Sequence, residues 1–187
     1  VLLDAEEEVW GDMPAGPTSA LNAVWAYSAG FDLSGDRAVF VGAGGLALEF
    51  AGGRFGLLET GIENDFKAIA DGVAVGDSGV IGLISADDVD GAFSVVPVVS
   101  STLEDLSDVF ADEDGWVFVG AEGSVFTMDE ALAPSFVGQV SGVLTSVCRT
   151  DAGVFVGGEG GLLAFMATGG DSFADVVTFT QSALRDI

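Results

Sequence analysis

The side chains best suited to hold a ligand are two cations that recur at one position of a repeated strand motif. A large apolar residue is followed by two variable residues and a β-branched one, and the first variable residue is polar in every copy: Asn22, Lys67, Ser107, Thr145 and Arg185. If these strands line a channel, alternate side chains face it. We therefore expect Lys67 and Arg185 to form an anion or acidic-peptide site at one channel mouth, or else to pair with Asp108 or Asp186 in a watered channel.

A second group of candidate ligands lies in two acidic turns. The turns Asp88-Val89-Asp90-Gly91 and Asp112-Glu113-Asp114-Gly115 offer alternating carboxylates and a turn glycine, which is half of what a calcium loop needs. The candidate calcium ligands are therefore Asp88, Asp90, Asp112 and Asp114. In a chain with 30 acidic residues such clusters also arise by composition alone, so solvated acidic turns are the alternative. The sequence implies no other cofactor.

Catalytic constellations are not apparent. The chain has no histidine and a single cysteine, Cys148, which disfavours a zinc site and a nucleophilic triad. A sialidase-type site needs an arginine cluster and a tyrosine nucleophile, but the four arginines are scattered and Tyr27 is the only tyrosine. Ser85-Ala86-Asp87-Asp88 begins like a sialidase sequence box and then lacks its glycine and tryptophan. We predict that the protein is not an enzyme.

The charge of the chain is strongly negative. Thirty acidic residues against five basic ones give a net charge of −25, yet 49% of the residues are hydrophobic and the mean hydropathy is +0.52. Such self-repulsion destabilises a compact state unless salt screens it, and in 1 M salt the Debye length falls to about 3 Å. With almost no lysine, the composition of the chain resembles that of proteins of salt-loving organisms, particularly haloarchaea and their viruses. The alternative is an ordinary acidic domain with a basic partner.

The charge argues against nucleic acid as a partner, and the pattern of the uncharged stretches argues against membrane insertion. Nucleic-acid binding requires a basic stripe, which five dispersed cations cannot form. Two long uncharged stretches, 13–31 and 131–148, are interrupted by proline and glycine, so we expect no membrane insertion. Protein partners, or a glycan, remain.

The chain is organised by a repeat of about 40 residues. Its most regular part is a valine, a glycine, two variable residues and a glycine (V-G-x-x-G), at 41–45, 75–79, 119–123 and 156–160. Upstream of each copy stands the apolar/β-branched pair described above: Leu21/Val24, Phe66/Ile69, Leu106/Val109 and Leu144/Val147, with a fifth pair, Leu184/Ile187, at the end. A period of this length indicates helical repeats or four-stranded propeller blades.

Local composition favours strands. Each unit consists of short Val, Phe, Leu and Trp runs separated by Gly, Asp and Ser. In one unit we predict strands at 106–111, 116–120, 124–128 and 135–140, with the V-G-x-x-G turn as a hairpin between the second and third. Because the second strands are apolar on both faces, each sheet should be stacked between two others.

The sequence Leu-x-x-Val followed by Gly-Trp-Val-Phe-Val-Gly-Ala-Glu-Gly resembles the propeller repeats of photosystem II assembly factors of the stability-factor type. The resemblance spans nearly the whole chain and implies a binding or assembly scaffold without a reaction. We predict an all-β, five-bladed β-propeller forming one domain, 1–187. Its repeats cover 21–65, 66–105, 106–143 and 144–183, and both termini, 1–20 and 184–187, build the closing blade. A segment of a larger propeller is the alternative.

The predicted function is that of a non-catalytic structural or interaction propeller in a halophilic assembly, such as a virion or surface component rather than a cytoplasmic protein. The alternative is a lectin-like protein that binds a glycan or receptor through loops such as 32–37 and 87–91.

Overall fold

The computed structural model describes residues 2–4, 9–11, 19–27, 37–86, 93–176, 178 and 180–187, and these form an all-β fold. Four antiparallel four-stranded sheets follow one another along the chain. Sheet I contains β3 (Leu21–Tyr27), β4 (Arg37–Gly42), β5 (Ala47–Ala51) and β6 (Arg54–Leu58). Sheet II contains β7 (Phe66–Ala70), β8 (Val73–Gly76), β9 (Ile81–Ala86) and β10 (Phe93–Val98).

Sheet III contains β11 (Leu106–Asp112), β12 (Gly115–Gly120), β13 (Ser124–Met128) and β14 (Ser135–Gln139). The four strands predicted for this unit are thereby confirmed to within one or two residues. Sheet IV contains β15 (Leu144–Thr150), β16 (Gly153–Gly158), β17 (Leu163–Ala167) and β18 (Ala174–Asp175). A two-stranded sheet of β1 (Leu2–Asp4) and β2 (Val9–Gly11) precedes them.

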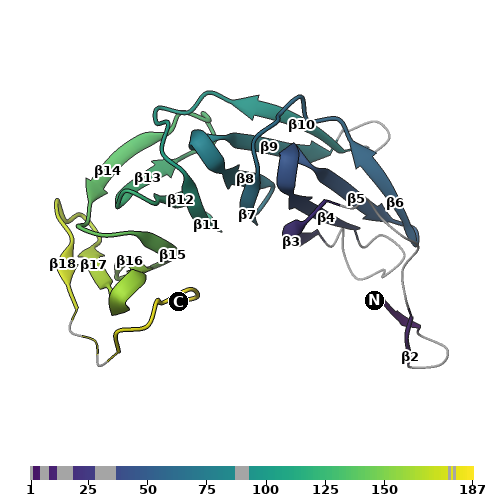
Figure 1. Cartoon of the computed structure of the whole chain (residues 1–187). Helices are drawn as coiled ribbons and strands as arrows, with labels where there is room; N and C mark the ends of the chain where they lie inside the picture. Colours follow the sequence, from purple (N-terminus) through teal and green to yellow (C-terminus); the bar gives the residue numbers. More distant parts are fainter. Residues whose placement is uncertain are drawn as a thin grey trace.

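The four sheets stand side by side like blades in an open arc (Figure 1). The first strand of each sheet lies on the concave side, where β7 is next to β3 and β11, and β11 is next to β15. The β1–β2 hairpin and the C-terminus lie at opposite ends of the arc (Figure 1). Blade-like packing of the repeats is therefore observed, whereas closure into a ring is not.

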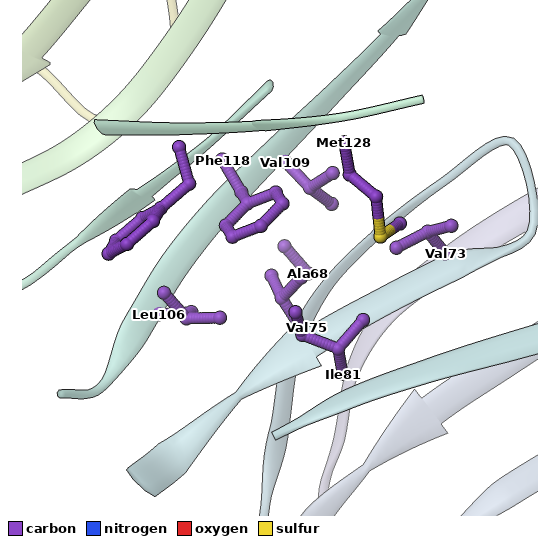
Figure 2. Close-up of a cluster of buried hydrophobic side chains, with 9 residues drawn as sticks. Ala68, Val73, Val75, Ile81, Leu106, Val109, Phe118 and Met128 are labelled. Carbon is purple, nitrogen blue, oxygen red and sulfur yellow. The ribbon is translucent and has the colours of Figure 1, made fainter. Parts of the chain in front are cut away.

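Three apolar layers hold neighbouring sheets together. The layer between sheets II and III contains Val75, Ile81, Leu106 and Phe118, all at most 1% exposed (Figure 2). On β12, Phe118 belongs to this layer, while Val117 and Val119 belong to the layer between sheets III and IV. The prediction that a sheet is stacked between two others is confirmed for sheets II and III, which have an apolar layer on each face, whereas sheets I and IV each share one such layer with a described neighbour.

The two glycines of V-G-x-x-G are explained by close approaches of the chain. A Cβ on the first glycine of the turn, Gly76, would lie 1.9 Å from the carbonyl oxygen of Asp65, just before β7. The last glycine, Gly79, has φ +73°, and a Cβ there would lie 2.2 Å from the carbonyl oxygen of Thr102 in the next connection. The turn therefore contacts the connections on both sides of its sheet, so neither glycine can carry a side chain without movement.

The fourth copy of the turn is displaced by one residue from its predicted place. In the ladders Gly42, Gly76 and Gly120 pair with the first residue of the preceding strand, and the residue that pairs with Leu144 in the same way is Gly158. The turn therefore spans 157–161 rather than 156–160, and Gly157 stands where the other sheets have valine. The glycine-rich run fits both alignments, and strand pairing decides between them.

Candidate functional site

Each first strand carries a β-bulge at the polar position singled out from the sequence. The ladder register shifts between Leu21 and Ala23, and the same shift recurs in β7, β11 and β15. The residues passed over are Asn22, Lys67, Ser107 and Thr145. A bulged residue is released from the ladder and its side chain is re-aimed. Sequence periodicity identified the position as polar but could not show this geometry.

Side chains at the bulge of sheets I and IV contact the repeat that follows. The side-chain amide of Asn22 donates a hydrogen bond of 2.7 Å to the carbonyl oxygen of Phe66, the first residue of β7. The hydroxyl of Thr145 donates to the carbonyl oxygen of Leu184, the first residue of the fifth motif copy. The bulge position is thus a link between adjacent repeats.

Lys67 connects sheet II to the start of sheet III through ion pairs. Its Nζ forms an ion pair with Asp77, in the turn that follows β8, and lies 3.2 Å from Oδ2 of Asp105, just before β11. The expected partners, Asp108 and Asp186, are not the ones that pair with it. Burial by itself lowers the pKa of Lys67, but the hydrogen bonds and charges of Asp77 and Asp105 outweigh it, so the pKa lies above its usual value.

Arg185 occupies the corresponding place in the fifth copy of the motif. Its side chain is exposed, and it forms no ion pair within 4.0 Å among the described residues. Lys67 and Arg185 share no partner there, because one lies in sheet II and the other follows sheet IV. The anion or acidic-peptide site based on both cations stays a prediction.

Asp108 is a half-buried acid whose environment the sequence did not reveal. Its Oδ2 accepts a hydrogen bond of 2.9 Å from the backbone N–H of Val147 in sheet IV. Burial raises the pKa of Asp108 to about 6, against the opposing effect of the N–H groups of Val147 and Val109, and the charge of Asp186 adds to the increase. One feature of the sequence sets Asp108 apart. The second variable residue of the strand motif is Asp108 in sheet III, but it is Ala23, Ala68 or Ser146 in the other sheets.

The acidic turn at 112–115 lines a cleft between sheets III and IV. Asp112 is bound by the guanidinium of Arg149, whose Nε lies 2.6 Å from its Oδ2, and Arg149 also donates to the carbonyl oxygen of Gly115 at 2.9 Å. The hydrogen bond from Arg149 holds the pKa of Asp112 below its usual value. The cleft has a volume of about 590 Å³, and Glu113, Asp114 and Asp151 also line it.

Of the four candidate calcium ligands, two can be placed. Asp112 accepts from Arg149 and from the backbone N–H of Asp114, at 2.9 Å, and Asp114 stands at the cleft. Asp88 and Asp90 lie outside the described residues. Within the described ranges, no group of three or more His, Cys, Asp or Glu residues is placed to hold a metal ion. Calcium binding stays a prediction.

Comparisons with known proteins leave the family open. No protein-family model matches the chain, and no curated protein matches it either. Four packed four-stranded sheets agree with the blade-like part of the predicted resemblance, and the specific family remains a prediction. No helix in the described part of the chain is long and apolar enough to cross a membrane.

Proposed function

We propose that the protein is a non-catalytic, salt-adapted propeller module that serves a structural or interaction role in a larger assembly, such as a virion or a surface layer. The propeller part of this proposal is supported best by an uncovered apolar face at the beginning of the arc. Leu21 and Val24 on β3 are 48% and 54% exposed, whereas their counterparts Leu106 and Val109 are 0% and 6% exposed. Leu57 on β6, which lies in the same row as Val24, is 64% exposed.

We infer that a fifth blade covers this face and closes the ring. The β1–β2 hairpin corresponds to the outer half of a repeat, and Leu184–Ile187 corresponds to its first strand. Brought together, they would lie between sheet I and sheet IV, and the layer that holds the other sheets together would then be continuous around the ring.

The ion pairs of the basic residues also favour a structural role. Three of the five cations, Arg37, Lys67 and Arg149, are held in ion pairs with acidic residues of the chain. Because the remaining surface is strongly acidic, we expect any protein partner to bind it at high salt, where the electrostatic repulsion is screened.

Two measurements test this function. Purification in molar KCl should recover stoichiometric protein partners, whereas binding on a glycan array under the same conditions without such partners would support the glycan-binding alternative. Titration of KCl with circular dichroism should show loss of structure as the salt is removed. A chain equally stable at low and molar KCl contradicts the salt adaptation.

The uncovered face has its own test. Leu21→Asp with Val24→Asp should abolish ring closure and association, while Val99→Asp with Leu103→Asp, at residues 89% and 87% exposed in a connection, should preserve both. The two pairs change the charge equally. Equal behaviour of the two variants contradicts a role for the face.

A further inference from the structure

The C-terminal segment, residues 180–187, is docked on sheet IV by a small number of contacts. The backbone N–H of Leu184 donates a hydrogen bond of 2.9 Å to the carbonyl oxygen of Gly158. The carbonyl oxygen of Leu184 accepts from the hydroxyls of Thr145 and Ser146, the second at 3.3 Å. Among the described residues the segment belongs to no ladder, so these contacts and its packing hold it in place.

The packing of the segment depends on a glycine. Gly157 stands where the other sheets have valine, and a Cβ at Gly157 would lie 3.1 Å from Cβ of Leu184 and 3.4 Å from Cγ2 of Ile187. The missing side chain therefore leaves the space that the segment occupies.

Asp108 contacts the same stretch of β15 from sheet III. Its Oδ2 accepts the hydrogen bond of 2.9 Å from the backbone N–H of Val147, the residue that follows Ser146. Two consecutive residues of β15 thus bind the C-terminal segment and Asp108. A change in the charge of Asp108 is therefore made next to the place where the segment is held.

The C-terminal segment carries a second carboxylate at the equivalent place. Asp186 is the second variable residue of its strand motif, as Asp108 is in β11 and Ser146 in β15. β15 therefore lies between two segments that each carry an aspartate at this position. The two carboxylates repel each other when both are ionised. Because Asp108 is half-buried against sheet IV, salt screens this repulsion less than it screens charges on the surface.

The other charged groups around β11 are paired with one another. Lys67 on β7 is held by Asp77 and Asp105, and Arg149 on β15 by Asp112. The strands β8 and β12 carry no titratable residue. Within the described part of the chain, Asp186 is the group whose charge raises the pKa of Asp108. The titratable groups that remain on the neighbouring elements are Cys148, whose Sγ lies 3.8 Å from the carbonyl oxygen of Arg149, and the exposed Arg185.

We propose that Asp108 is a pH-sensitive switch for the C-terminal segment, which is held on sheet IV when Asp108 is protonated and loosened by repulsion of Asp186 when Asp108 is ionised. This docking involves described residues alone, whether or not the ring closes. Burial first, and then the charge of Asp186, raise the pKa of Asp108 to about 6, and release of the segment removes that charge. Docking therefore strengthens as the pH falls through about 6 and weakens as it rises.

Hydrogen exchange of the Leu184 amide in molar KCl measures the docking. After correction for the intrinsic pH dependence of exchange, protection should increase at least about twofold from pH 7 to pH 5, since one unit of pKa difference between the docked and released states corresponds to tenfold. Asp108→Asn, whose amide oxygen can still accept from Val147, should give high protection at both pH values. Asp171→Asn, at an exposed residue between β17 and β18, should keep the pH dependence. Protection that does not change with pH in the unaltered protein, or that changes equally in Asp108→Asn, overturns the proposal.

Titration of the Asp108 carboxyl by NMR tests the reciprocal effect. Its midpoint should fall when Gly157→Val displaces the segment and when Asp186→Asn removes the second charge. Gly56→Val, where no atom lies within 4 Å of the added Cβ, and Asp171→Asn should leave the midpoint unchanged. Asp186 is exposed, so its replacement does not endanger folding, and an unchanged midpoint in Asp186→Asn overturns the proposal. An unchanged midpoint in a Gly157→Val protein whose Leu184 amide has lost protection overturns it as well.

Discussion

The carboxylate of Asp105 accepts a hydrogen bond of 2.9 Å from the backbone N–H of Ser78. Ser78 has φ +56° in the turn after β8, and Asp105 immediately precedes β11, so the bond joins sheet II to sheet III. The same bond recurs at 2.7 Å between the N–H of Gly44 and Asp65, before β7. Before β7 and β11, a carboxylate immediately ahead of the first strand thus accepts a hydrogen bond from the turn of the preceding sheet.

Removal of the Asp105 carboxylate should loosen sheets II and III. We expect Asp105→Ala to lower the free energy of unfolding by about 1–2 kcal/mol, because both the turn N–H and Lys67 lose a partner. Asp105→Asn should cost less, since an amide oxygen can still accept from Ser78. Urea unfolding in molar KCl measures both, with the exposed Glu130→Ala as the control. Equal losses in Asp105→Ala and Glu130→Ala would contradict the link.

The pH dependence of this link follows from the lowered pKa of Asp105, which is caused first by the N–H of Ser78 and then by Lys67, against burial. Because the folded value lies below the unfolded one, the stabilisation is present above the unfolded value and is lost as the pH falls through the folded value. Asp105→Asn should therefore remove part of the acid-induced loss of stability, which unfolding curves below pH 4 would show.

Asp108 should have the opposite pH dependence. Its pKa is raised from 3.8 to about 6 in the folded protein, so ionisation opposes folding and stability increases as the pH falls from about 6 towards 4. The slope from this group is at most about 1.4 kcal/mol per pH unit. Asp108→Asn should remove this component from urea unfolding curves measured between pH 4 and 7. Parallel pH profiles for the two proteins would contradict the assignment.

Gly157→Val should displace the C-terminal segment although it restores the residue found at this place in the other sheets. Its Cβ would also lie 2.7 Å from Oγ of Ser146, in addition to the contacts with Leu184 and Ile187. Hydrogen exchange at the Leu184 amide should accelerate at least about tenfold, which corresponds to 1.4 kcal/mol of lost protection. Gly56→Val, where no atom lies within 4 Å of the added Cβ, is the control. Unchanged hydrogen exchange in Gly157→Val would contradict the close packing of Leu184 and Ile187 against Gly157.

Ala183→Asp should add a hydrogen bond between the C-terminal segment and the turn of sheet IV. Ala183 precedes Leu184 as Asp65 precedes Phe66, and Gly160, φ +66°, corresponds to Gly44 in the turn. A hydrogen bond from the Gly160 N–H to the new carboxylate should stabilise the C-terminal segment by about 0.5–1.5 kcal/mol in molar KCl. Hydrogen exchange of residues 180–187 measures the effect, with Ala183→Asn to separate charge from hydrogen bonding. A decrease in protection would contradict the equivalence of the two positions.

The sequence predicted the elements whose cause is local. Sheet III was placed within one or two residues because glycines and acidic residues separate its apolar runs, and a strand covered on both faces must be apolar throughout. The position of the fourth turn failed because Gly157, Gly158, Gly160 and Gly161 satisfy two alignments, and only pairing with Leu144 distinguishes them.

The candidate site depended on geometry that periodicity does not contain. Alternation along a regular strand pointed Lys67 towards Asp108 or Asp186, but the bulge turns the side chain towards Asp77 and Asp105. The burial of Asp108 likewise depends on Val147, 39 residues later, which lies beside it only after two sheets have packed. Contacts between repeats are consequences of packing, and no spacing within a single repeat reveals them.

The bulge in each first strand has a consequence for how this protein can change over generations. A residue outside the ladder is free of the β-sheet preference that constrains its neighbours, which accounts for asparagine, lysine, serine and threonine at one equivalent place. Substitutions there leave the ladder hydrogen bonds within each sheet in place, but at Asn22, Lys67 and Thr145 they change the contact with the next repeat. The position can therefore vary in polarity and charge as long as the new side chain still reaches a partner in the following repeat.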